Sequence, residues 1–455
     1  MDYQYLKCIS PLDGIYKSSI KDLESFFSEL SFNKYKILIE IEYLISLGKI
    51  DIYDDLGDEL IEFLRNIYKN FDLDECIKLK EIEIECVDNE KQNVGAIEYY
   101  IKRIISNKDS SLDLINYIHF GLNSQDIDSN ANILMIKQSI SKVLLPKINK
   151  ILGKIKENIL EWSKVPLLSK INGLSDAPTF LGKEMLVFYE RTVIQARKLN
   201  GINYTTKFGG TNGNFNAHHM ALPNIDWVEF GNKFVKILGL ERNQYTTQID
   251  HYDNYAEIFD CLKRINVILI DFCQDIWSYI SRGVLVHKLN GHKLNGHKLN
   301  GHKLNGHKLY INFETAEGNL LLANSMLEFF SRKLPTSRLQ RDSTDSTILR
   351  NVGSAFSYSL IAFNSIMEGL DKIVINEKEI NNELNKNYMV IEEGLHTRMK
   401  VLGIGDQLKQ ISQNSNSEEI KKDLLRFIEQ NDFSMEEKKY LKTITPFNYT
   451  GIYKL

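Results

Sequence analysis

Proline is scarce in this chain, which has only seven prolines among 455 residues. Because proline removes a backbone donor and breaks the helical hydrogen-bond ladder, its scarcity suits long helices. The five cysteines are widely scattered, and no Cys-x-x-Cys pair occurs among Cys8, Cys76, Cys86, Cys261 and Cys273. We therefore expect reduced thiols in a cytosolic protein rather than a disulfide framework.

The chain also lacks an excess of one charge and a long uninterrupted apolar run. Its net charge is −4, which gives no electrostatic case for binding nucleic acid or an anionic membrane. The most apolar stretch, residues 265–280, contains Asp271 and Asp275, so we interpret it as a buried core helix rather than a membrane span. The first residues carry no signal-peptide pattern, and we expect a cytoplasmic location with neither nucleic-acid nor membrane partners.

Apolar residues recur at three- and four-residue spacing through the middle of the chain. Such patterns cover residues 146–162, a stretch after Gly182, and residues 255–280, 313–330 and 352–373. Long helices of this kind are typical of a bundle, and no sustained alternation indicates a large sheet.

The ends of the chain carry shorter helical patterns and more charged turns. We therefore predict an all-α protein in three parts: an N-terminal helical domain over 1–111, a central bundle of long helices over 112–372, and a C-terminal helical domain over 373–455. A chain of this length is large enough for two or three domains around a sizeable core.

A five-residue repeat, His-Lys-Leu-Asn-Gly, starts at His287, His292, His297 and His302, and an incomplete copy starts at His307. A glycine in every full copy disfavours a helix, and a five-residue step rotates by about 140° around one, so the histidines would not share a face. We predict a surface loop over 287–310. Closely spaced histidines can chelate zinc, copper or nickel, but replicative slippage in a tolerant loop is the simpler explanation, so we assign no metal site.

Several polar segments between the predicted helices are not required by packing. One of them, residues 337–350, contains Arg338, Arg341 and Arg350 with hydroxyl side chains between them. The planar guanidinium fork suits phosphate or carboxylate recognition. Spacing alone favours a plainer interpretation, in which the segment is a solvated, capped helix start with surface ion pairs.

These segments resemble those of adenylosuccinate lyase, in the bacterial-type branch of the fumarase/aspartase superfamily. The resemblance runs from the Ser-Pro-Leu-Asp-Gly string at residues 10–14 to Thr-Pro-Phe-Asn-Tyr at residues 445–449, and it is most specific at Gln-Arg-Asp, residues 340–342, with Asp-Ser-Thr at residues 345–347. It implies an all-α, fumarase/aspartase-like fold and a chemistry that needs no cofactor. It also implies a homotetramer in which each active site takes residues from three subunits.

The family's reaction is a β-elimination in purine nucleotide biosynthesis. Fumarate leaves adenylosuccinate to give AMP, and it also leaves the succinylated carboxamide precursor. A base removes a carbon-bound proton, an acid protonates the leaving nitrogen, and other groups hold the phosphate and stabilise developing negative charge. The resemblance implies a set of substrate-binding residues that this chain retains by residue type: Tyr16, Ser124, Gln248, Arg341, Ser346, Thr347 and Arg350. Two further candidates are His119 and Lys308.

The two proton-transferring groups of the family are missing here. Its general acid is a histidine in a Thr-His-Gly-Gln string, and the matching position is Asn172. Its base is a serine in a mobile Gly-Ser-Ser-x-Met-Pro-His-Lys-x-Asn-Pro loop, which the repeat replaces, and no serine lies between Ser281 and Ser325. The family's phosphate-binding Arg-Tyr pair reads Ile15-Tyr16. The resemblance therefore implies impaired or absent catalysis.

Three hypotheses remain open from the sequence. The first is an active lyase that uses substitute histidines, taken from the repeat or from His218 or His219, because histidine has an ordinary pKa of about 6.5. A base on a glycine-rich loop is poorly positioned for this role. The second is a non-catalytic homologue that keeps the scaffold and holds AMP or adenylosuccinate weakly. The third is a metal-binding role for the histidine repeat.

Overall fold

The computed structural model describes residues 4–50, 52–53, 56–87, 93–109, 112–288, 302–403 and 417–454, and helices account for most of them. The α-helices are α1 (Glu24–Phe27), α2 (Glu29–Gly48), α3 (Asp58–Lys69), α4 (Leu73–Val87), α5 (Asn93–Lys108), α6 (Ser124–Ser139), α7 (Leu145–Glu161), α8 (Leu181–Asn200), α9 (Asn216–Ala221), α10 (Trp227–Ile237), α11 (Asp253–Ser281), α12 (His302–Lys333), α13 (Thr344–Leu349), α14 (Val352–Lys372), α15 (Glu377–Lys386), α16 (Glu392–Val401), α17 (Ser417–Gln430) and α18 (Met435–Thr443).

Strands are short in the described part of the chain, and they form two-stranded sheets. The pairs are β1 (Pro166–Ile171) with β2 (Leu174–Phe180), antiparallel; β3 (Thr205–Thr206) with β4 (Glu241–Arg242), parallel; and β5 (Leu285–His287) with β6 (Ile373–Ile375), antiparallel. The prediction of an all-α fold without a large sheet is confirmed.

The chain divides into two compact units. The first comprises residues 1–148, 195–267 and 319–362, and the second comprises residues 149–194, 268–318 and 363–455. The sequence predicted three domains, over 1–111, 112–372 and 373–455. The two compact units do not test these boundaries, which stay a prediction.

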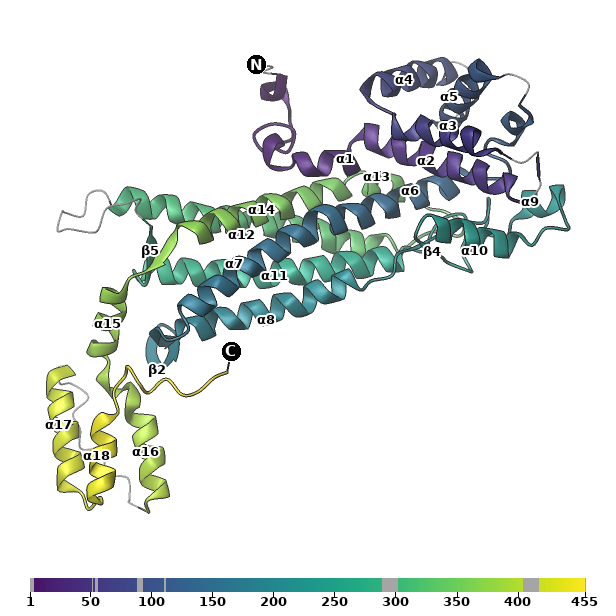
Figure 1. Cartoon of the computed structure of the whole chain (residues 1–455). Helices are drawn as coiled ribbons and strands as arrows, with labels where there is room; N and C mark the ends of the chain where they lie inside the picture. The colour runs from purple at the N-terminus through teal and green to yellow at the C-terminus, as the bar shows by residue number, and fades with distance from the viewer. Residues whose placement is uncertain are drawn as a thin grey trace. The chain divides into compact units, whose positions relative to one another are not determined.

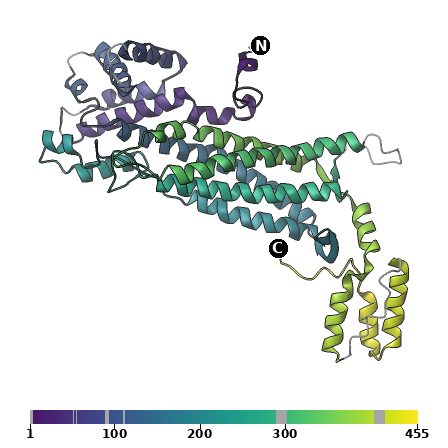
Figure 2. The ribbon, with the colours of Figure 1, turned by 180° about the vertical axis from the view of Figure 1, so that it is seen from behind.

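The first unit begins with a helical subdomain in which α3, α4 and α5 lie beside α2 (Figures 1 and 2). Helix α2 starts at the N-cap Ser28, whose side chain accepts a hydrogen bond from the backbone N–H of Ser31. Such a cap satisfies one of the donors that a helix start leaves free. The faces of these helices bury one apolar cluster, which includes Ile37, Leu44, Leu64, Leu79 and Ile101.

The second unit contains the β1–β2 hairpin and the C-terminal helices. Helices α16, α17 and α18 lie side by side in both views (Figures 1 and 2). They bury a cluster of their own, which includes Ile391, Leu395, Leu424 and Ile428.

All five long periodic patterns of the sequence form helices, namely α7, α8, α11, α12 and α14. The apolar stretch at 265–280 lies in α11, where Ile265, Leu269 and Phe272 are fully buried. Within the described ranges, every helix is too short or too polar to span a bilayer. Cys8, Cys76, Cys261 and Cys273 are free thiols, as expected.

The predicted loop over 287–310 is wrong at both of its described ends. His287 closes strand β5, and α12 already begins at His302, so the last part of the repeat is helical. A glycine inside a helix costs about 1 kcal/mol, but Leu309 and Phe313 are buried in the same helix, and this burial favours its extension towards the N-terminus. Residues 289–301 lie outside the described part of the chain.

Candidate functional site

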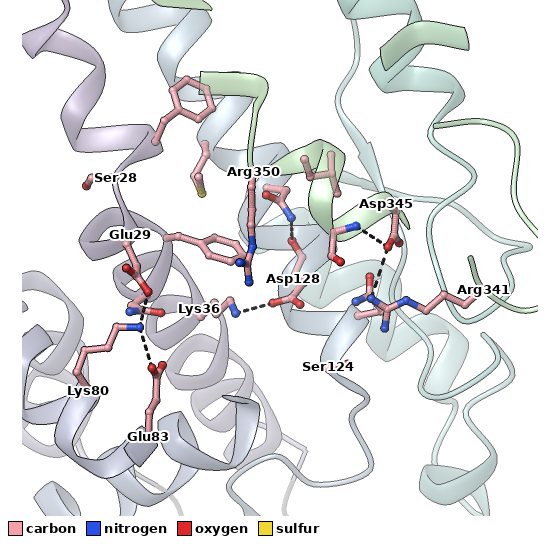
Figure 3. Close-up of a pocket in the computed structure, with 18 residues that line it drawn as sticks. Ser28, Glu29, Lys36, Lys80, Glu83, Ser124, Asp128, Arg341, Asp345 and Arg350 are labelled. Carbon is pink, nitrogen blue, oxygen red and sulfur yellow. Dashed lines mark hydrogen bonds and ion pairs between the residues drawn. The ribbon is translucent and has the colours of Figure 1, made fainter. Parts of the chain in front are cut away.

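The first unit contains a pocket of about 600 Å³ between α2, α4, the start of α6 and the segment around α13 (Figure 3). Four of the seven predicted substrate-binding residues line it: Ser124, Arg341, Ser346 and Arg350. Ser124 and the other three residues are more than two hundred positions apart in the sequence. The fold therefore brings together residues that the resemblance assigned to one binding site.

Most charges in the pocket are paired with one another. Lys36 lies 3.0 Å from Asp128, and Lys80 contacts both Glu29 and Glu83 (Figure 3). Arg341 lies 3.6 Å from Asp345.

Arg350 differs from the other cations that line the pocket. It forms no ion pair with any residue that the structure describes, and its side chain extends towards Lys36 and Asp128 in Figure 3. An exposed guanidinium at the wall of a pocket is suited to bind an anion, because its planar fork can donate two parallel hydrogen bonds to one phosphate or carboxylate.

Ser124 is placed by the start of helix α6. Asn123 caps this helix and forms a capping box with Asp126. Asp126 is fully buried, and its carboxylate accepts hydrogen bonds from Lys207 Nζ at 2.7 Å and from the backbone N–H of Gly209 at 2.8 Å. A buried charge must be paired in this way, and the pair fixes the first turn of α6 against the segment at 207–210.

Arg341 is held between two partners. With the Gln125 amide turned so that its oxygen faces the guanidinium, that oxygen accepts from both terminal nitrogens of Arg341, at 3.0 and 3.2 Å. Asp345 lies on the other side and also accepts the backbone N–H of Ser346 at 2.6 Å. The Ser346 hydroxyl donates to the Ser343 carbonyl at 2.9 Å.

The remaining predicted binding residues lie outside the wall of this pocket. Tyr16 is half-buried directly before the 3₁₀ turn Lys17–Ser19, and Gln248 is half-buried in the loop between β4 and α11. Thr347 is exposed on α13. Lys308 falls in the first turns of α12, and its side chain is outside the described part of the chain.

Asn172 occupies the tip of the β1–β2 hairpin and is exposed. Ile171 pairs with Leu174, so Asn172 and Gly173 form a two-residue turn, and both have positive φ, 53° and 79°. A turn with two left-handed residues matches the twist of the strands and favours Asn-Gly. This dipeptide is a readable hairpin signal that the sequence analysis missed.

His119 is tied to two carboxylates of the N-terminal subdomain. Its Nδ1 lies 2.5 Å from Glu40 Oε1 and 3.9 Å from Glu98. Burial alone would lower the pKa of His119, but the charge of Glu40 and the hydrogen bond with it raise the pKa above its ordinary value. The histidine therefore carries charge at higher pH than usual and stabilises the buried Glu40.

His218 is a core residue and does not fit the role of a substitute acid or base. Its side chain is 0% exposed, its Nε2 lies 3.1 Å from the Tyr43 hydroxyl, and it packs against Phe120 and Trp227. Burial lowers the pKa of His218 to about 4, so its ring is neutral at physiological pH. Its neighbour His219 is exposed.

Only the first histidine of the repeat has a side chain within the described residues. The Nδ1 atom of His287 lies 2.8 Å from the Lys288 carbonyl, whereas His292 and His297, and the side chains of His302 and His307, are outside the described residues. Among the described residues, no three His, Cys, Asp or Glu side chains are grouped to hold a metal ion.

Comparison with known proteins gives matches over nearly the whole chain. A family model described as "Lyase" matches residues 45–296, and one described as "Adenylosuccinate lyase C-terminal" matches residues 337–450. An adenylosuccinate lyase of Dictyostelium discoideum is 41% identical over 98% of this chain and 97% of its own length. The chain belongs to the adenylosuccinate lyase family. A relative of the same name from Buchnera aphidicola is 37% identical over 99% of this chain and 98% of its own length.

Solved structures agree with this family at the level of the fold. A 3-carboxy-cis,cis-muconate lactonizing enzyme from Pseudomonas putida matches with a TM-score of 0.73, at 14% identity, over 96% of each chain. A fumarate lyase from Mesorhizobium sp. BNC1 matches with a TM-score of 0.71, at 13% identity, over 95% of each chain. The predicted fumarase/aspartase-like fold of this adenylosuccinate lyase family member is confirmed.

Proposed function

We propose that this chain is an adenylosuccinate lyase-like protein of purine nucleotide biosynthesis that binds an anionic nucleotide but has impaired or absent lyase catalysis. The observation that carries the binding part is the pocket lined by Ser124, Arg341, Ser346 and Arg350, in which Arg350 has no ion pair among the described residues. Two guanidinium groups and two hydroxyls in one pocket suit AMP or adenylosuccinate, whose charged groups are phosphate and carboxylates.

The loss of catalysis is argued from the groups available for proton transfer. Asparagine does not exchange a proton near neutral pH, so Asn172 cannot replace the family's general acid. No serine lies between Ser281 and Ser325, where the family's base belongs. His218 is buried and neutral, so it cannot compensate for either loss. An active lyase would need a substitute for the general acid and a substitute for the base at the same time.

The test of catalysis is release of fumarate from adenylosuccinate by the purified chain. We expect no fumarate above the buffer background. The variant Asn172→His serves as a second arm, because histidine tolerates the left-handed backbone and should leave the hairpin folded. We expect this variant to stay inactive, since the base would still be missing. Turnover by the wild type near that of an ordinary metabolic enzyme, or such turnover in Asn172→His, would contradict the proposal.

The test of binding is calorimetric titration with AMP. Replacing Arg350 by Ala removes a charge-assisted contact of about 1.5–3 kcal/mol, so the Kd for AMP should rise about 10- to 150-fold. Arg338→Ala is the matched control, because Arg338 lies in the same segment, is 84% exposed and does not line the pocket. Equal affinity in the two variants, or no binding of AMP by the wild type, would refute the nucleotide site.

We also propose that the chain assembles as a homotetramer, as the resemblance implies. Support comes from large apolar side chains that are exposed on the long helices: Val187 and Ile194 on α8, Val267 and Trp277 on α11, and Leu321, Leu322 and Phe329 on α12. Exposed apolar side chains in such numbers favour association. Sedimentation velocity should give the mass of four chains, and a monomer at micromolar concentration would contradict this part of the proposal.

A further inference from the structure

Tyr252 lies at the end of the loop that follows β4 and carries Gln248. Its φ is +58°, which a bulky side chain rarely adopts, and its side chain is only 1% exposed. The backbone N–H of Tyr252 donates to Asp250 Oδ1 at 2.8 Å, and Asp250 Oδ2 accepts from Asn243 Nδ2 at 3.0 Å. Buried hydrogen bonds thus hold a costly backbone conformation, which is typical of positions that serve a site.

The hydroxyl of Tyr252 connects this loop to the pocket. It donates to Asp345 Oδ2 at 3.0 Å, while Asp345 Oδ1 accepts the backbone N–H of Ser346 and lies 3.6 Å from Arg341. Burial, together with the charge of Asp345, raises the pKa of Tyr252 well above its ordinary value, so the hydroxyl remains the donor. One buried carboxylate therefore links Tyr252 to two residues of the pocket wall.

We propose that Tyr252 is a positioning residue for the pocket, whose hydroxyl fixes the Asp345 carboxylate and thereby holds Arg341 and Ser346 in place for an anionic ligand. Both oxygens of Asp345 are occupied, so the carboxylate is not free to rotate. Arg341 is then fixed between Asp345 and Gln125 before any ligand arrives. Preorganisation of this kind lowers the cost of ordering a binding site. The identity of the ligand rests on the proposed function, whereas the positioning of Arg341 does not.

The variant Tyr252→Phe removes the hydroxyl and keeps the ring. Tyr255→Phe is the matched control, because Tyr255 is also fully buried, its ring packs edge-on against Tyr252, and its hydroxyl donates to the Ser129 carbonyl at 3.3 Å and not to a pocket residue. Each variant loses one buried tyrosine hydrogen bond, so a general loss of stability should affect both alike.

The first readout needs no ligand. Phenylglyoxal modifies arginine side chains, and peptide mass spectrometry after chymotryptic digestion separates the rate at Arg341 from the rate at Arg350. We expect Tyr252→Phe to raise the rate at Arg341 about fivefold, the factor that one lost hydrogen bond typically gives, and to leave Arg350 unchanged. Tyr255→Phe should match the wild type at both positions. An unchanged or lower rate at Arg341 in Tyr252→Phe, or an equal rise in Tyr255→Phe, would overturn the proposal.

The second readout is the Kd for AMP. We expect it to rise about three- to tenfold in Tyr252→Phe and to stay within about twofold of the wild type in Tyr255→Phe. If the wild type does not bind AMP, the proposed nucleotide site fails, and the phenylglyoxal rates still decide whether Tyr252 positions Arg341. If the wild type binds AMP and the two variants bind it equally well, the positioning role fails and the nucleotide site stands.

Discussion

Acidification from pH 7.5 to 5.0 should destabilise the folded chain through His218. The ring is fully buried, and burial lowers its pKa from 6.5 to about 4. Between these two values the unfolded chain binds the proton and the folded chain does not. The stability that depends on a neutral His218 is therefore complete above pH 6.5 and is lost as the pH falls towards about 4.

The size of this effect follows from the shift in the pKa. The lowering of the His218 pKa from 6.5 to about 4 corresponds to about 3.4 kcal/mol of stability when the loss is complete. At pH 5.0 the loss of stability should be about 2 kcal/mol, because His218 is largely protonated in the unfolded chain and still largely neutral in the folded chain. At pH 7.5 the loss should be close to zero.

Urea unfolding of wild type and His218→Gln at both pH values measures the effect. Tryptophan fluorescence is a suitable probe, because Trp227 packs against His218 with ring centroids 4.8 Å apart. Glutamine does not titrate, so the wild type should lose about 2 kcal/mol more than the variant on acidification. His219→Gln, at the exposed neighbouring position, should behave as the wild type does. The same loss in wild type and His218→Gln would refute the reasoning, including the conclusion that His218 cannot act as a substitute base.

Two further variants test the local structure. Asn172→Ala should lower the free energy of unfolding of the second unit by about 1 kcal/mol, because alanine is strained at positive φ. Asn172→Gly should not lower it, because glycine adopts positive φ without strain. Urea unfolding of both variants measures the difference, and an alanine variant more stable than the glycine variant would contradict the turn geometry. Lys207→Met should lower the free energy of unfolding by about 3–5 kcal/mol in the same assay, because it leaves the buried Asp126 carboxylate without its cationic partner. The double variant Lys207→Met with Asp126→Asn should recover part of this loss. A mild effect of Lys207→Met alone would argue against the buried ion pair.

The helical fold could be predicted from the sequence because its long helices have one-sided apolar patterns. The pattern before Trp162 and the pattern after Gly182 both formed helices, since burial of an apolar stripe drives each of them. The predicted loop is wrong at its C-terminal end because the buried Leu309 and Phe313 stabilise a helix that the glycines of the repeat disfavour.

The pocket could be predicted in part. The resemblance grouped Arg341, Ser346 and Arg350 with Ser124, and all four line the same pocket. The pairing of Lys36 with Asp128 carries no local signal, because the two residues are far apart in the chain and meet only through the packing of α2 against α6. The same holds for Tyr252 and Asp345.

The turn at the tip of the β1–β2 hairpin bears on the proposed loss of catalysis, because its fold does not depend on a histidine at position 172. Its first position needs a side chain that tolerates a left-handed backbone, and both histidine and asparagine meet that need. The codons of these two amino acids differ only in their first base. A single point mutation at position 172 can therefore exchange the two while the hairpin folds as before, so purifying selection on folding alone would not oppose the change in either direction.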